Sequence, residues 1–328
     1  MGQYGAALPW LRRAVDAVER LEEFPKQQLL GETLRPVGAC LFHLGQFDEA
    51  SALLRRAVEA LQDADQRGEV NKRSLGLTMF ALGACLKSMG DFEPARDWYE
   101  RAVEILEKGD TLGRVDHASL GLSVASVGYC LFCLGRFDEA RAWYERAVQA
   151  TQVGDRHGRV DYERLGVNLH YVGSCLSNMG RLEEARAWYE RAVDAKRQGD
   201  SHGRVSHESL GNSMHQLGYC LSSTGDPEAA VPWFERAVEA KGRGDRHGRV
   251  DQTSLSGSLH QVGFCLWSMG KFEEARGWHD RALSAARKGD LDGRVSHDRV
   301  GASMHEVGLC LGSTGNPDEA RAWYERAL

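Results

Sequence analysis

Apolar residues recur along most of the chain at intervals of three and four residues, the spacing that places them on one face of an α-helix. Residues 161–205 illustrate the pattern. A first apolar stripe contains Leu165, Leu169, Val172, Leu176 and Met179. A second stripe begins near Leu182 and contains Ala185, Trp188, Tyr189, Ala192 and Val193. The pattern predicts a first helix that ends at Gly180 and a second helix that ends at Gly199, because glycine commonly follows the last turn of a helix.

The same pair of stripes returns every 45 residues. Seven of the eight cysteines keep this step, at Cys40, Cys85, Cys130, Cys175, Cys220, Cys265 and Cys310. Two series of glycines and one of tryptophans keep it as well. Most units carry five glycines in fixed places, which accounts for nearly the whole excess in the total of 37 glycines. The repeating units are approximately 26–70, 71–115, 116–160, 161–205, 206–250, 251–295 and a truncated 296–328, preceded by a partial unit, 1–25. A fixed period of this length is typical of a repeat architecture.

Each unit therefore consists of a first helix and a second helix. Residues that favour helix N-caps stand where the first helices begin, namely Asn71, Asp116, Asp161, Ser206, Asp251 and Ser296. Neither helix can bury its apolar stripe alone, but neighbouring units can stack to form a continuous core. We expect an all-α protein, a single solenoid over residues 1–328, with about seven antiparallel helix pairs and an N-terminal half-repeat.

The repeats resemble the tetratricopeptide repeat. The residues that carry the resemblance are Gly173, Leu176, Gly180, Leu182, Ala185, Tyr189 and Ala192, together with their counterparts in other units. The usual unit has 34 residues, so this chain is more similar to the long-unit arrays of kinesin light chains and bacterial signalling proteins. The resemblance implies a right-handed superhelix with a concave groove that binds a protein or peptide.

The two ends of the chain match only parts of a repeat. Residues 2–15 have the pattern of a second helix without its first, and the chain stops inside the last second helix. Solenoids normally carry capping helices at their ends. We therefore expect a piece of a longer protein, and end-to-end self-association is an alternative way to cover the exposed ends.

Composition limits the function classes. The 328 residues carry a net charge of −6, whereas nucleic-acid binding relies on a basic surface, so we expect no nucleic-acid partner. No apolar run is long enough to span a membrane, and no signal peptide is visible.

Cysteines in consecutive units should lie too far apart for disulfides. They are better interpreted as small buried residues than as a metal or redox site, although Cys130 and Cys133 are three apart. We expect a cytoplasmic protein.

A ladder of histidines is the strongest candidate for a binding site. His170, His215, His260 and His305 stand three residues before a repeated glycine in four successive first helices. In the tetratricopeptide family this position faces the concave groove. Aromatic residues should lie close to it, and we place Tyr129, Tyr171, Tyr219, Phe264 and Trp267 in the same strip. The strip would be aromatic and would titrate near neutral pH. The alternative is that the histidines only pack between neighbouring first helices.

The loops between units repeat an Asp-Gly-Arg pattern just before a helix start. Such loops can bind anions at a helix N-terminus. We favour an internal ion-pair clamp, because each arginine would then be neutralised locally. The expected pairs are Asp155 with Arg159, Asp200 with Arg204, and Asp245 with Arg249.

No feature of the sequence supports catalysis. The HExxH, GxSxG and GxGxxG motifs do not occur, and the polar residues recur as similar copies, whereas an active site needs different groups at one point. We expect a non-catalytic binding scaffold without metal or cofactor. The alternatives are a sensor or autoinhibitory arm of a larger signalling protein with a kinase, NTPase or protease effector, and a self-associating structural array.

Overall fold

The computed structural model describes residues 2–22, 26–67, 72–109, 114–154, 158–200, 206–245 and 247–327. These residues form fifteen α-helices and no strand. The helices are α1 (Gly2–Glu19), α2 (Lys26–His43), α3 (Phe47–Gln66), α4 (Lys72–Met89), α5 (Phe92–Glu107), α6 (His117–Cys133), α7 (Phe137–Val153), α8 (Tyr162–Asn178), α9 (Leu182–Asp200), α10 (His207–Ser223), α11 (Pro227–Arg243), α12 (Gln252–Ser268), α13 (Phe272–Ala286), α14 (His297–Ser313) and α15 (Pro317–Ala327). The all-α solenoid expected from the repeats is confirmed.

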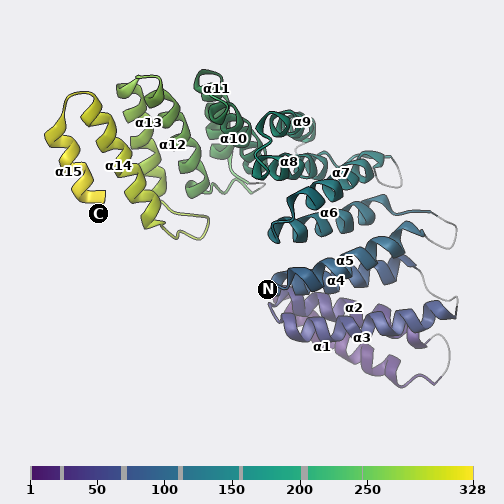
Figure 1. Cartoon of the computed structure of the whole chain (residues 1–328). Coiled ribbons are helices and arrows are strands. Elements are labelled where there is room, and N and C mark those ends of the chain that lie inside the picture. Colours follow the sequence, from purple (N-terminus) through teal and green to yellow (C-terminus); the bar gives the residue numbers. More distant parts are fainter. Residues whose placement is uncertain are drawn as a thin grey trace. The chain divides into compact units, whose positions relative to one another are not determined.

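The chain forms two compact units, residues 1–161 with α1–α7 and residues 162–328 with α8–α15. Within each unit, helices that follow one another in sequence lie side by side as antiparallel pairs (Figure 1). The even-numbered helices are the first helices of the repeats and the odd-numbered ones are the second helices. Successive first helices also contact each other, α2 with α4 and α4 with α6 in one unit, α8 with α10 and α12 with α14 in the other.

Side chains cap four of the first helices, α6, α10, α12 and α14, as predicted. Asp116, Ser206, Asp251 and Ser296 each accept a hydrogen bond from the backbone N–H three residues later. Asn71 lies outside the described residues. Side-chain caps of this kind satisfy one of the N–H groups that a helix start leaves without a partner.

Glycine ends the first helices, because a glycine with a positive φ follows each of them within two residues. Gly180, for example, has a φ of +76°, a conformation that other residues rarely adopt. One predicted boundary is wrong, since α9 continues through Gly199 to Asp200. Its counterparts Gly154 and Gly244 do follow the ends of α7 and α11.

A second series of glycines lets the two helices of a pair approach closely. A Cβ atom built on Gly173 would lie 2.9 Å from the Cε1 atom of Tyr189, closer than carbon atoms can pack. The equivalent glycine and aromatic residue meet in α4–α5, where Gly83 faces Tyr99. Tyr99 and Tyr189 are buried.

The repeated cysteines are buried beside these contacts as predicted, and burial raises the pKa of Cys130 to about 12.

The repeated tryptophans lie at the surface edge of the second helices, where each stacks against an arginine three residues later. The Arg191 guanidinium is 4.1 Å from the Trp188 ring centre, and the Arg281 guanidinium is 4.0 Å from Trp278. Residues three apart share a helix face, so the pair covers the apolar stripe from solvent. This geometry agrees with a packing role for the tryptophans.

Candidate binding surface on the first helices

Each histidine of the ladder packs on the aromatic residue of its own second helix. The ring centres of His170 and Tyr189 are 5.2 Å apart, and those of His215 and Phe234 are 5.3 Å apart. The same contact joins His260 to His279 at 5.2 Å and His305 to Tyr324 at 5.3 Å. The histidines therefore sit above the glycine–aromatic contact that holds each helix pair together.

Two of the histidines also contact the next first helix. His170 Nδ1 lies 3.0 Å from Ser213 Oγ, and His215 Nδ1 lies 3.0 Å from Ser258 Oγ. His170, His215 and His260 are partly buried, whereas His305 on α14 is exposed. The first two histidines thus have the packing contacts that the alternative interpretation expects.

A buried lysine completes the hydrogen-bond network between α8, α9 and α10. Lys196 is only 2% exposed, and its ammonium donates to Ser209 O at 2.8 Å and to Ser213 Oγ at 2.9 Å. Because Ser213 Oγ accepts from the lysine, its hydroxyl hydrogen is available to His170 Nδ1. The Nδ1 atom is then the acceptor, and the proton of the neutral ring lies on Nε2.

Burial lowers the pKa values of three histidines of the ladder. Burial, aided by the nearby Lys196 charge, lowers the pKa of His170 to about 3, and burial also lowers the pKa of His215 to about 3. The pKa of His260 is lowered for the same reason. The expectation of titration near neutral pH is therefore wrong for His170 and His215, because the protein interior disfavours their charged form.

The aromatic residues of the predicted strip differ in exposure. Tyr219 on α10 and Phe264 on α12 occupy the same place in successive repeats and are 44% and 43% exposed. Tyr171 is partly buried, with its ring edge against His170 at 5.8 Å between centres. Trp267 is partly buried beside Phe272, and its Nε1 has no hydrogen-bond partner within the described residues. Tyr219 and Phe264 therefore have the largest exposed fractions among the aromatic residues of the strip.

Tyr129 lies in the other compact unit, on α6. Its ring is partly buried and meets the edge of Phe92 at 6.5 Å between ring centres. The Lys87 ammonium lies 5.3 Å from its ring centre. Tyr129 thus lies among side chains of α4–α6 and is considered separately from the residues on α8–α14.

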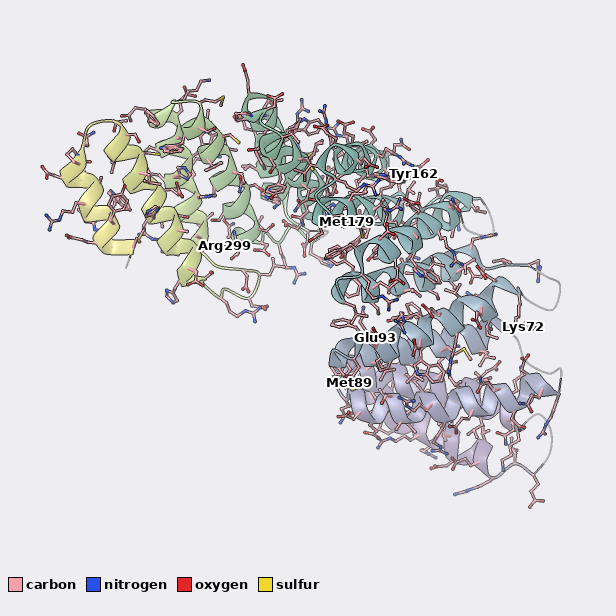
Figure 2. All side chains as sticks on the ribbon, in the orientation of Figure 1. Lys72, Met89, Glu93, Tyr162, Met179 and Arg299 are labelled. Atoms are coloured by element: carbon pink, nitrogen blue, oxygen red, sulfur yellow. The ribbon has the colours of Figure 1, made fainter. Side chains whose placement is uncertain are left out.

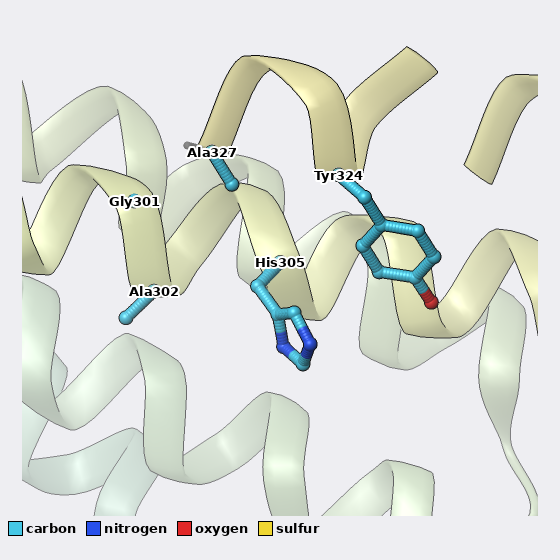
Figure 3. A pocket seen from close by; sticks show the side chains of 5 residues that line it. All are labelled: Gly301, Ala302, His305, Tyr324 and Ala327. Carbon is cyan, nitrogen blue, oxygen red and sulfur yellow. The ribbon is translucent and has the colours of Figure 1, made fainter. Parts of the chain in front are cut away.

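His305 lines an open recess of about 470 Å³ between α14 and α15. Its ring and that of Tyr324 lie side by side there, with Gly301, Ala302 and Ala327 around them (Figure 3). Most of the lining is apolar. The equivalent histidine of α8, His170, instead contacts Ser213 of the following first helix, α10.

Of the predicted loop clamps, the structure describes one pair in full. Asp245 accepts from the backbone N–H groups of His247 and Arg249, and the Arg249 side chain is 2.6 Å from its carboxylate. These hydrogen bonds, first of all the one from the Arg249 backbone, lower the pKa of Asp245 to about 2. Asp290 and Arg294 form the same pair. The other two pairs, Asp155 with Arg159 and Asp200 with Arg204, stay as predictions. The described residues do not include Asp155, Arg204 or the side chain of Asp200.

Lys196 and Lys241 are the polar residues that the sequence pattern missed. Both are buried, and burial lowers the pKa of each to about 8. The signal was present in the sequence, because Leu61 and Leu106 occupy the equivalent place in α3 and α5. An exchange of leucine for lysine at a core position indicates a local change of chemistry.

The described residues contain no group of three or more His, Cys, Asp or Glu side chains placed to hold a metal ion. Across the same residues, none of the helices has both the length and the apolar character needed to cross a membrane (Figure 2 shows the side chains).

The 45-residue period, the paired helices and the glycine–aromatic contacts define an α-helical repeat protein. A tetratricopeptide repeat model matches residues 29–108, 122–198, 164–242 and 254–328, and a second model of the same repeat matches residues 212–289. The chain belongs to the tetratricopeptide repeat family. This fold is a scaffold for protein–protein interaction and is generally non-catalytic. No curated protein matches the sequence of the chain.

Several solved structures share the fold. A signal transduction ATPase with numerous domains (STAND), which has a tetratricopeptide repeat sensor and comes from Pyrococcus horikoshii, aligns with a TM-score of 0.69 and 15% identity over 99% of this chain and 44% of that one. The apo form of RapI aligns with a TM-score of 0.60 and 11% identity over 90% and 96%. BtubC (BKLC) from P. vanneervenii aligns with a TM-score of 0.58 and 18% identity over 72% and 89%. This chain therefore spans less than half of the STAND protein.

Proposed function

We propose that the protein is a non-catalytic scaffold that binds a protein or peptide along the concave side formed by its first helices. The observation that carries the proposal is the pair of exposed aromatic residues, Tyr219 and Phe264, at the same place in the neighbouring helices α10 and α12. Large aromatic side chains are the usual anchors of protein interfaces, because they bury much area at little cost in conformational entropy.

The proposed strip assigns different roles to its members. Tyr219 and Phe264 make the main contacts, with Tyr171, Trp267 and the exposed His305 beside them. His170, His215 and His260 lie beneath and fix the spacing of the first helices. In the other compact unit, Tyr129 supplies a separate aromatic contact. A surface above the uncharged rings of His170 and His215 favours an apolar or uncharged segment of the partner.

The test is a peptide selection followed by titration calorimetry. Peptides that bind the 328-residue protein are selected from a displayed random library, and the tightest one is titrated into variants. We expect the double variant Tyr219→Ala, Phe264→Ala to weaken binding by at least about tenfold, since aromatic anchors commonly contribute about 1–2 kcal/mol or more each.

The matched control is Trp10→Ala, which removes another exposed aromatic side chain, 70% exposed on α1. It should leave the affinity unchanged. The variant pair His215→Phe and His260→Phe tests whether the histidines touch the partner, because phenylalanine keeps the ring packing. Equal affinity of the wild type and the Tyr219, Phe264 double variant, with the same helical circular dichroism, would remove the basis of the proposal.

The second candidate is a sensor arm of a larger signalling protein that contacts its own effector domain. It is supported by the alignment of nearly the whole chain with part of the STAND protein, which has a tetratricopeptide repeat sensor. The two functions differ in what binds. A scaffold binds selected peptides equally well alone or within its full-length gene product, whereas an autoinhibitory arm is blocked by its effector domain until a signal arrives.

A further inference from the structure

The second helices α13 and α15 carry the same line of three residues, a glutamate, a tryptophan and an arginine. The lines are Glu274, Trp278 and Arg281 in α13, and Glu319, Trp323 and Arg326 in α15. Residues spaced by four and then three positions lie on one face of a helix. The four charged residues are exposed and the two tryptophans are partly buried. Both helices contact α14 within one compact unit (Figure 1), so the two lines form one solvent-facing surface.

The glutamates of these lines lack the partner that an earlier repeat provides. In α9 the equivalent glutamate, Glu184, is paired with Arg181 three residues before it, at 2.6 Å. The residue three before Glu319 is Asn316, which carries no charge. A lysine stands three before Glu274, but within the described ranges neither Glu274 nor Glu319 takes part in an ion pair. Both carboxylates therefore face solvent with their charge uncompensated.

The arginines have lost an internal partner as well. In α7 the equivalent arginine, Arg146, is 3.0 Å from Glu107 of the preceding second helix. The place of Glu107 is taken by Gly242 in the repeat before Arg281 and by an arginine in the repeat before Arg326. Each guanidinium instead stacks on the tryptophan of its own line, at 4.0 Å and 5.4 Å from the ring centre. Stacking leaves the N–H edge of a guanidinium free to donate, and neither arginine has an ion pair in the part of the chain that the structure describes.

The uncompensated charges make this surface complementary to itself. The glutamate and the arginine of a line are seven residues apart, about 10 Å along the helix axis. A second copy can be turned by 180° about an axis that lies in the surface and crosses the helices at right angles. Its helices then run antiparallel to those of the first copy, and each glutamate faces an arginine. Rotation about an axis parallel to the helices would place glutamate against glutamate, so the charges favour the antiparallel arrangement.

We infer that the surface formed by α13 and α15 binds a second copy of this chain in the antiparallel arrangement. Glu274 of each copy pairs with Arg281 of the other, and Glu319 pairs with Arg326 in the same way, while the tryptophans meet between these pairs. The surface does not extend to α11, where Ala229 takes the place of the glutamate. The inference goes beyond the proposed function, because it concerns the second helices and not the aromatic strip.

Sedimentation equilibrium of the 328-residue protein measures this association. Exposed ion pairs contribute little individually and are screened by salt. We therefore expect a dimer with a dissociation constant on the order of 0.1 mM at about 50 mM NaCl, and one at least about tenfold weaker at about 500 mM NaCl. An interface that uses the same patch on both copies closes at two. A protein that stays monomeric at about 0.5 mM in low salt, or that grows beyond the dimer, would overturn the inference.

Charge exchange tests which residues face each other. Arg281→Glu and Glu274→Arg each place like charges opposite one another, so each should weaken the dimer by about tenfold or more. The double variant Glu274→Arg, Arg281→Glu exchanges both charges and should restore the wild-type dissociation constant to within about threefold. The two single variants, mixed in equal amounts, should bind each other more tightly than either binds itself. A double variant as weak as the single ones would contradict the antiparallel pairing.

The matched control is Arg191→Glu on α9. Arg191 is exposed and stacks on Trp188 at 4.1 Å, so the variant makes the same change of charge outside the surface. It should leave the dissociation constant unchanged, and equal helical circular dichroism shows that each variant keeps its fold. A dimer weakened by Arg191→Glu and not by Arg281→Glu would overturn the assignment to α13 and α15. Tyr219 and Phe264 are intact in every variant, so a negative result here leaves the aromatic strip to its own test.

Discussion

Lys196 provides the sharpest test of how the repeats are packed. The residue is 2% exposed, and its ammonium lies between α9 and α10, where it donates to Ser209 O and Ser213 Oγ. The equivalent residues Leu61 and Leu106 are buried in the same place in α3 and α5. Lys196→Leu therefore restores the apolar solution that the chain itself uses elsewhere.

The expected gain follows from the pKa of the lysine. Burial lowers it from 10.5 to about 8, which corresponds to about 3 kcal/mol of destabilisation by the charged form below pH 8. Leucine removes this cost but also removes the two hydrogen bonds, each contributing about 1 kcal/mol. Ser213 keeps His170 as a partner, so we predict a net stabilisation of about 1–2 kcal/mol at pH 7.

The pH dependence distinguishes this cause from a general improvement of packing. Between about pH 8 and pH 10.5 the unfolded chain holds the lysine proton and the folded chain does not. Wild-type stability therefore rises with pH in this window, whereas the Lys196→Leu variant lacks this contribution. The advantage of the variant should be largest below pH 8 and should shrink as the pH approaches 10.5.

Urea unfolding followed by circular dichroism at pH 7, 9 and 10 measures the difference. Local hydrogen exchange of α9 and α10 confirms where it arises, because helical repeats can unfold in parts. The control is Lys288→Leu, since Lys288 is exposed beyond the end of α13. The reasoning is refuted if Lys196→Leu is less stable than wild type at pH 7, or if its advantage does not change with pH.

Three further predictions concern other residues of the core. His279 is fully buried with both ring nitrogens unpaired among the described residues, so His279→Phe, which copies Phe234 of the preceding repeat, should raise the unfolding free energy by about 2 kcal/mol at pH 7 in urea titrations. Burial lowers the pKa of His279 to about 4. As the pH falls, the imidazole is protonated in the unfolded chain before it is protonated in the folded protein, so wild-type stability falls between about pH 6.5 and 4. The His279→Phe variant should therefore lose about 3 kcal/mol less stability over that range. An identical acid profile would contradict the assignment. Gly173→Val should destabilise by about 2 kcal/mol or more, because even a Cβ atom would lie 2.9 Å from Tyr189, and an unchanged melting temperature would argue against the close helix contact.

The repeat pattern was enough to predict the helices. The glycine, cysteine and tryptophan series fixed the period, and the caps at Asp116, Ser206, Asp251 and Ser296 formed where serine and aspartate were expected. These features are local, so they depend on neighbouring residues in the sequence. The end of α9 was missed because a glycine near a helix end does not by itself stop the helix.

The environment of the candidate strip could not be predicted in the same way. The sequence identified the histidine ladder but not the contact of His170 with Ser213 in the next unit, and this contact depends on how the first helices meet. The lowered pKa of His170 follows from that burial. Lys196 and Lys241 were overlooked because they depart from the repeat, and the meaning of such a departure is clear only when its neighbours in space are known.

Site-specific photo-crosslinking of the selected peptide tests most directly where the partner binds. A benzophenone side chain is placed at Phe264 on α12 or, in a separate variant, at Trp278 on the second helix α13. We predict a covalent adduct with the peptide at position 264 and none at position 278, with mass spectrometry locating the bond. An adduct at position 278 without one at position 264 would contradict binding along the first helices.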